Sequence, residues 1–96
     1  MAKTYYFYGH EGSEQGNAPH PEAHEQTVAL ITSSGSELVF QTHKDLGGVT
    51  YQIGQAGTLA IYDAGADKPT IVFGPQAWFS VMGDVHRTAT LADNLK

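Results

Sequence analysis

The stretch "QTVALITSSGSELVFQTH", residues 26–43, decides the fold class of this 96-residue chain. It opens with β-branched and aliphatic side chains that suit a mostly buried strand. Residues 33–36 are serines and a glycine, which tolerate the tight backbone of a turn. Residues 37–43 then divide between two faces, and one face holds Leu38 and Phe40, as in a half-buried strand. We therefore predict a β-hairpin over residues 26–43.

Similar short segments recur along the rest of the chain, separated by glycine, serine, asparagine or proline. No segment shows the sustained 3.6-residue apolar stripe of an amphipathic helix. The predicted strands are residues 4–8, 26–32, 37–43, 49–53, 58–63, 70–73 and 77–82. This pattern predicts an all-β fold, a small antiparallel sandwich or barrel of about seven short strands with an extended N-terminal arm. We expect residues 1–25 to form the N-terminal strand and polar arm, and residues 26–96 to form the β domain.

The composition narrows the classes of partner. Ten acidic residues against five basic ones give a net charge of −5, which offers no positive field to a nucleic acid. The absence of cysteine excludes a disulfide, a thiolate metal site and a cysteine nucleophile. Apolar runs reach about four residues, far short of the roughly 20 that span a bilayer as a helix. We therefore expect neither a nucleic acid nor a membrane as partner.

Residues 9–25 hold three of the five histidines in an otherwise polar stretch. His20 and His24 are four residues apart, and a helical turn opened by Pro21 would place both on one face as a metal pair, with His10 as a further ligand. The glycines and prolines of the stretch are typical of a loop, and the spacing matches no zinc-binding helix motif. We therefore favour a polar arm without a cofactor, with a metal site as the alternative.

Residues typical of catalysis are present but form no recognisable motif. No serine lies in a G-x-S-x-G elbow. An acid–base cluster could in principle form from Asp63, Asp67, Asp84 and His86. Asp63 and Asp67 are more simply explained as turn residues. We therefore predict no catalytic residues and a protein that is not an enzyme.

Two aromatic segments suggest surfaces that meet other proteins. Residues 5–8 put rings on both faces of one strand, so a sheet covered on one side would leave two of them wet, whereas contact with a neighbour would bury all four. A strand followed by a long polar stretch also suits an arm that adds its strand to another subunit's sheet. Alternation places Trp78 and Met82 together on one face of residues 77–82. The candidate interface residues are Tyr5, Tyr6, Phe7, Tyr8, Trp78 and Met82, although the same side chains would also suit a core.

The segments "IGQAGTLAIYDAGAD", residues 53–67, and "TIVFG", residues 70–74, resemble the central part of the head-decoration proteins of tailed bacteriophages. The shared pattern is a glycine, a short strand ending in Tyr-Asp-Ala, a polar loop, and a second strand closing on glycine. The resemblance covers about 22 of the 96 residues. It implies a small β-rich protein, usually trimeric, that cements the outside of a capsid through an N-terminal segment. The aromatic opening strand and the histidine-rich stretch depart from the family pattern.

Together these observations favour a structural assembly protein that acts by protein–protein contacts, most concretely a capsid decoration or cementing protein. Its expected partners are capsid or other virion subunits and copies of itself. Its expected location is the virion, and the host cytoplasm before assembly. Two alternatives remain, a metal-binding β-barrel domain or small enzyme that uses the N-terminal histidines, and an acidic inhibitor or immunity-type protein that blocks a basic surface.

Overall fold

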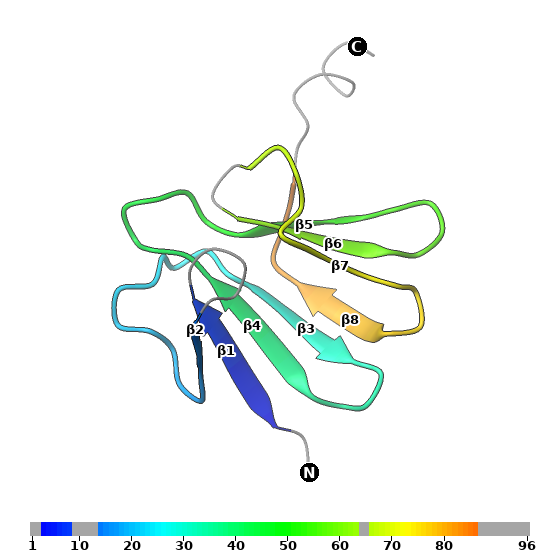
Figure 1. Cartoon of the computed structure of the whole chain (residues 1–96), viewed down its shortest axis with the longest axis horizontal. Helices are drawn as coiled ribbons and strands as arrows, with labels where there is room; N and C mark the ends of the chain where they lie inside the picture. The colour runs from blue at the N-terminus through cyan, green and yellow to red at the C-terminus, as the bar shows by residue number, and fades with distance from the viewer. Residues whose placement is uncertain (1–2, 9–13, 64–65, 87–96) are drawn as a thin grey trace.

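All regular structure in the described part of the chain is β (Figure 1). The computed structural model describes residues 3–8, 14–63 and 66–86. The strands are β1 (Thr4–Tyr8), β2 (Glu14–Gly16), β3 (Val28–Thr32), β4 (Glu37–Gln41), β5 (Thr50–Ile53), β6 (Leu59–Tyr62), β7 (Ile71–Phe73), β8 (Trp78–Met82) and β9 (Asp84–Val85). The predicted all-β class is confirmed. The two strands beyond the expected seven, β2 and β9, are short.

The first sheet has the strand order β2-β1-β4-β3-β8. At its centre lies the hairpin predicted from residues 26–43, in which β3 and β4 pair antiparallel with Val28 opposite Phe40. The turn between them contains Gly35 at a φ of 94°, which an L side chain rarely adopts. The hairpin prediction is therefore confirmed, with strands slightly shorter than expected.

Both sheets contain one parallel pair, so the sheets are mixed rather than purely antiparallel. In the first sheet β1 runs parallel to β4, and Phe7 lies opposite Phe40. In the second sheet, ordered β7-β6-β5-β9, the parallel pair is β5 and β9. An alternating apolar pattern specifies which side chains face the core but not the direction of the neighbouring strand, and the expectation of antiparallel sheets was wrong on this point.

The two sheets share one core. Val28, Leu30 and Phe40 come from the first sheet, and they pack with Leu59 and Ile61 of β6 and with Val49 before β5. All six are buried side chains. Burying each large aliphatic side chain contributes roughly 1.5–3 kcal/mol, so this cluster is the main source of stability.

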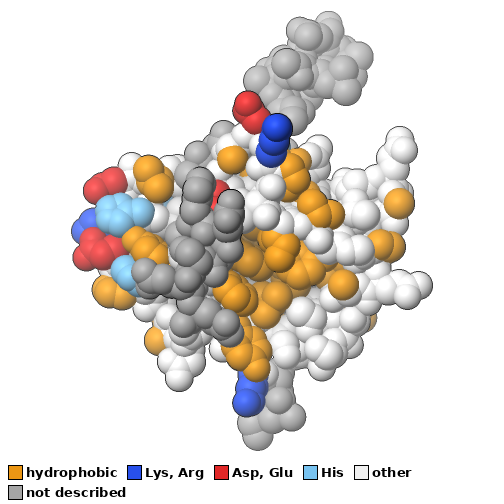
Figure 2. All heavy atoms as spheres, in the orientation of Figure 1, with side chains coloured by type: hydrophobic (Ala, Val, Ile, Leu, Met, Phe, Trp, Pro, Cys, Tyr) orange, Lys and Arg blue, Asp and Glu red, His pale blue; other side chains and the backbone are white. Residues whose placement is uncertain are grey.

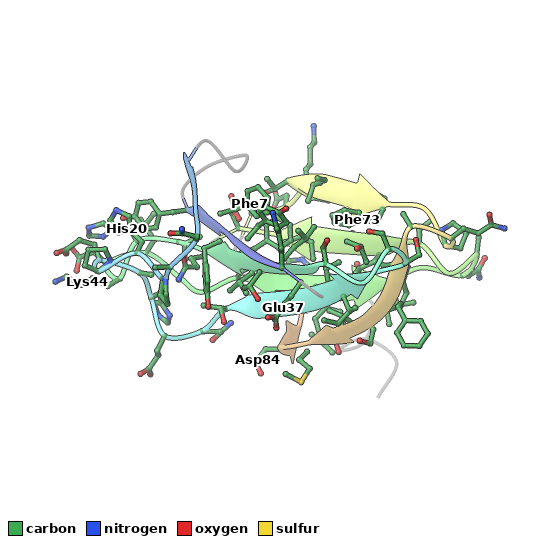
Figure 3. All side chains as sticks on the ribbon, turned by 90° about the horizontal axis from the view of Figure 1, so that it is seen from below. Phe7, His20, Glu37, Lys44, Phe73 and Asp84 are labelled. Carbon is green, nitrogen blue, oxygen red and sulfur yellow. The ribbon has the colours of Figure 1, made fainter. Side chains whose placement is uncertain are left out.

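A row of phenylalanine rings joins the sheets beside this core. The Phe7 and Phe40 rings are stacked with centroids 5.2 Å apart, and Phe40 meets Phe73 of β7 at 6.3 Å. Hydrophobic side chains gather along the middle of one face of the molecule, over elements of both sheets (Figure 2). The labelled Phe7 and Phe73 lie near one another in the view of Figure 3. β1 is thus tied to the second sheet through side chains as well as to β4 through its backbone.

Gly83 forms the corner where the chain leaves β8 in the first sheet and enters β9 in the second. Its φ is 143°, in a region that side-chain-bearing residues rarely adopt. A Cβ atom at this position would lie 2.9 Å from the Thr27 carbonyl oxygen and 3.0 Å from Val28 Cγ2. The corner therefore requires glycine both for its backbone conformation and for lack of space.

Among the described residues, no helix is long and apolar enough to span a membrane.

Candidate functional site

β1 carries four of the predicted interface residues, and each of them is half-buried. Phe7 packs against the core, while alternation turns Tyr6 and Tyr8 to the opposite face of the sheet. The Tyr8 ring stacks on His20, with centroids 3.6 Å apart and planes 8° apart. β1 also pairs with β2 on one side and β4 on the other, so both of its edges are used within its own chain. Adding β1 to another subunit's sheet would require breaking these pairs.

The prediction that Trp78 and Met82 lie on the same face of β8 was wrong. Trp78 lies opposite Thr32 and Ser80 lies opposite Ile31, so Phe79 is skipped as a bulge. Trp78 consequently turns inward against the core, where its Nε1–H donates to the Gly57 carbonyl oxygen at 2.8 Å. A bulge reverses which side chains face the core beyond it, and no residue pattern in this segment indicated a bulge.

The exposed hydrophobic side chains of β8 are Met82, as the sequence suggested, and Phe79, which sequence reasoning missed; the small polar Ser80 is exposed as well. Phe79 is 78% exposed and Met82 is 70% exposed. Met82 lies opposite Ala29 and therefore projects from the face of the first sheet that is turned away from the core. Aromatic and methionine side chains are enriched in protein–protein interfaces, so this exposure marks β8 as the candidate functional surface.

Four of the described strands lie at sheet edges, and β8 is the least protected of them. Proteins prevent unwanted strand pairing at edges with short strands, charges, proline or bulges. β2 has three residues, β9 has two residues including Asp84, and β7 has three residues and is followed closely by Pro75. β8 has five residues, none of which is charged or proline, and its one irregularity is the bulge at Phe79. β8 is therefore the edge best suited to pair with another chain.

The histidine pair does not lie on the helical turn that the sequence suggested. The Ala23 N–H donates to the His20 carbonyl oxygen at 3.1 Å, which closes a turn of the β type. Ala23 then pairs with His43, and the His24 N–H donates to the Thr42 carbonyl oxygen at 2.7 Å. Pairing with residues beyond β4 satisfies the backbone groups that a helix would have used internally, so the segment is extended.

The imidazole rings of this pair contact backbone amides. His20 Nδ1 accepts the Glu22 N–H at 3.0 Å, and His24 Nδ1 accepts the Gln26 N–H at 2.9 Å. His10, the third predicted ligand, lies outside the described residues. No group of three or more His, Cys, Asp or Glu side chains within 3–8, 14–63 and 66–86 is placed to hold a metal ion. The described residues thus supply no ligand set for the metal alternative.

An ion pair lies at the same end of the molecule as the histidine pair. Lys44 Nζ lies 2.9 Å from Glu22 Oε1, and the Lys44 N–H also donates to the Glu22 carbonyl oxygen at 2.7 Å. His20 and Lys44 are close neighbours in the view of Figure 3. Both partners of the ion pair are about half exposed, so it contributes little stability and serves mainly to fix the segment against the end of β4.

His86 has structural partners rather than acidic ones. Its ring stacks on Tyr62 with centroids 3.8 Å apart, and its Nδ1 lies 3.1 Å from Thr50 Oγ1. The Tyr62 hydroxyl in turn donates to Gln52 Oε1 at 3.1 Å. This chain of contacts fastens the end of β9 to β5 and β6, and it brings no carboxylate to the imidazole among the described residues.

No family model matches the sequence, and no curated protein or solved structure matches it significantly.

Proposed function

We propose that this chain is a structural assembly protein, most concretely a capsid decoration or cementing protein that binds virion subunits and copies of itself. The observation that carries this proposal is the exposure of Phe79 and Met82 on β8, an uncharged sheet edge. Burying such a side chain against a partner contributes roughly 1.5–3 kcal/mol before the costs of association, so two together are a substantial anchor.

The distribution of charge is compatible with assembly from many copies. The chain has a net charge of −5, which makes free copies repel one another within the screening distance of about 8–10 Å at physiological salt. β8 itself has no charged residue, so a contact made there places no like charges directly together. An apolar contact of this kind is weakened little by salt, whereas inhibition by acidic mimicry would lose affinity as salt screens the charges.

The capsid as partner is supported by the resemblance over residues 53–74. These residues include the turn after β5, then β6 and β7, which pair antiparallel with Leu59 opposite Phe73. Two short strands around a polar loop are what the family pattern implies. The same segment supplies Leu59 and Ile61 to the core, so in this proposal it acts as scaffold while β8 makes contact.

Co-sedimentation with purified capsid shells of tailed phages tests the proposal. We expect wild-type protein to pellet with the shells at both low and high salt. Phe79→Thr and Met82→Thr keep a strand-compatible side chain but remove the apolar anchor, and each is expected to weaken binding about tenfold or more. Val72→Thr is the matched control, because Val72 is 54% exposed on a different edge.

Sedimentation equilibrium of the free protein, with the same three variants, measures association between copies. Capsid binding that is equally strong in wild type and both β8 variants would contradict the role of β8. Absence of both capsid binding and self-association in the wild type would contradict the proposed function as a whole. Deleting residues 1–25 is a poorer test, because it removes β1 and β2 from the first sheet.

A further inference from the structure

A small pocket lies on the face of the first sheet that is turned away from the core, two strands away from β8. Its volume is about 170 Å³. Its floor comes from β1 and β4, and its rim comes from the segment that follows β2. The lining residues are Tyr6, Tyr8, Gly16, Ala18, Pro19, His20, Pro21 and Gln41.

Gln41 gives this pocket an unused hydrogen-bond donor. The side chain is 5% exposed, and its Oε1 accepts the His20 N–H at 3.3 Å. Its Nε2 forms no hydrogen bond to another described residue. This nitrogen nevertheless retains some exposure to solvent, because it is not one of the fully buried side-chain atoms that lack a partner. Since Gln41 lines the pocket, the pocket is where this donor can meet an acceptor. A ligand that brought no acceptor would leave the buried amide unpaired, at a cost in affinity.

Flat rings form the wall beside this donor. Tyr6 and Tyr8 lie on the same face of β1, about 7 Å apart along the strand, and Tyr8 is held against His20 by stacking. Pro19 and Pro21 add two rigid rings at the rim. None of the described residues that line the pocket is Asp, Glu, Lys or Arg, so these residues offer no ion pair to a charged ligand.

The size of the pocket and the chemistry of its described lining residues favour one uncharged ring that carries acceptors. A drug-sized or nucleotide ligand needs about 300–1,000 Å³, more than is present. A proline ring or an aliphatic side chain would fit, but neither brings an acceptor to Gln41. We propose that the pocket binds a single neutral sugar ring, a monosaccharide unit of a glycan. One apolar face of the sugar packs on the aromatic wall, and a ring hydroxyl accepts from Gln41 Nε2.

This binding is separate from the proposed assembly contact, because the pocket and β8 share no residue. A particle decorated with such a protein would present sugar-binding pockets at the same time as it was held by β8. The pocket can therefore be tested on free protein, without capsids.

Titration of ¹⁵N-labelled protein with methyl glycosides of glucose, galactose, mannose and N-acetylglucosamine, up to about 50 mM, tests the proposal by NMR. We expect at least one sugar to shift the Gln41 side-chain amide and the backbone amides of Tyr8 and Gly16, while the amides of β8 stay in place. Gln41→Met keeps the length of the side chain but removes the donor, and is expected to weaken binding about tenfold. Gln55→Met, at an exposed glutamine in the turn after β5, is the matched control and should bind as the wild type does.

A second variant guards against a Gln41→Met protein that does not fold. Ala18 is exposed at the rim, so Ala18→Trp leaves the core alone and is expected to fill the pocket and abolish the shifts. The proposal is overturned if none of the four sugars shifts these signals. It is also overturned if a proline-rich peptide shifts them instead, or if Gln41→Met and Ala18→Trp both bind sugar like the wild type.

Discussion

β1 and β8 flank the same central hairpin and are both rich in aromatic residues, yet the fold uses them in opposite ways. β1 lies beside β4 and pairs on both edges, and its four aromatic side chains are all half-buried. β8 lies beside β3 at the end of the sheet, where Phe79 and Met82 are largely exposed. The aromatic side chains of β1 are therefore all partly covered, whereas those of β8 divide between Trp78, which packs against the core, and Phe79, which faces solvent.

The difference shows that strand position, rather than aromatic content, decides whether the side chains of a strand are covered or exposed. An internal strand has no free backbone edge, and its side chains are covered on one face by the second sheet. An edge strand retains a row of free backbone groups, which another chain can pair with. Changes to β1 should therefore alter stability, whereas changes to the outer side of β8 should alter binding.

Phe7→Ala is expected to cause the largest loss of stability among these substitutions. A small loss would contradict the contrast between β1 and β8. The change removes the ring that stacks on Phe40 and packs against the shared core. We expect the free energy of unfolding to fall by about 3 kcal/mol, as for other phenylalanine-to-alanine changes in cores. Urea denaturation followed by circular dichroism measures it, and a loss below about 1 kcal/mol would mean that β1 is not an integral strand.

Gly83→Ala tests the corner at which the chain passes from β8 in the first sheet to β9 in the second. The added Cβ would lie 2.9 Å from the Thr27 carbonyl oxygen, in a backbone conformation unsuited to alanine. We expect a loss of about 2 kcal/mol from strain and crowding together. Gly35→Ala is the matched control, because Gly35 also has a positive φ but has open space around it. Equal losses of stability at the two positions would show that crowding at the corner does not contribute to the loss.

Trp78→Phe tests the inward orientation produced by the bulge in β8. The substitution keeps an aromatic ring but removes the hydrogen bond from Nε1 to the Gly57 carbonyl oxygen. We expect a loss of about 1 kcal/mol, typical of one hydrogen bond with some change of packing. Thermal unfolding measures the loss, and capsid binding should stay unchanged. Lost binding with unchanged stability would instead place Trp78 on the outer surface with Met82.

Phe79→Thr is expected to have the smallest effect on stability. Since 78% of the side chain is already exposed, the free energy of unfolding should change by no more than about 0.5 kcal/mol. A loss as large as that of Phe7→Ala would erase the distinction between the two strands. The measurement is the same urea denaturation, carried out in parallel with Phe7→Ala.

The sequence predicted the parts of this fold that depend on local pattern. The turn at Gly35 and the alternation around Phe40 specified the hairpin, and the strand predicted over residues 58–63 contains β6, whose Leu59 and Ile61 are fully buried. The predicted all-β class followed from these signals. Each of them needs only neighbouring residues to be interpreted, which is why sequence reasoning succeeded.

The remaining features depend on contacts between distant residues. The parallel pairing of β1 with β4 joins residues 33 positions apart, and nothing in either strand encodes its direction. The bulge that exposes Phe79 is set by the register between β8 and β3, so alternation assigned Trp78 to the wrong face. The extended path at Ala23 likewise depends on pairing with residues after β4, and it replaces the helical turn that the metal-site alternative required of His20 and His24.

Hydrogen exchange of the backbone amides in β1 and β8 tests the separate roles of these strands most directly. The rates are measured in the free protein and again in protein bound to capsid shells. We predict slow exchange for β1 in both states, and exchange in β8 that is faster in the free protein and slows on binding. Protection that appears in β1 on binding, with β8 unchanged, would contradict the assignment of β1 to the core and β8 to the interface.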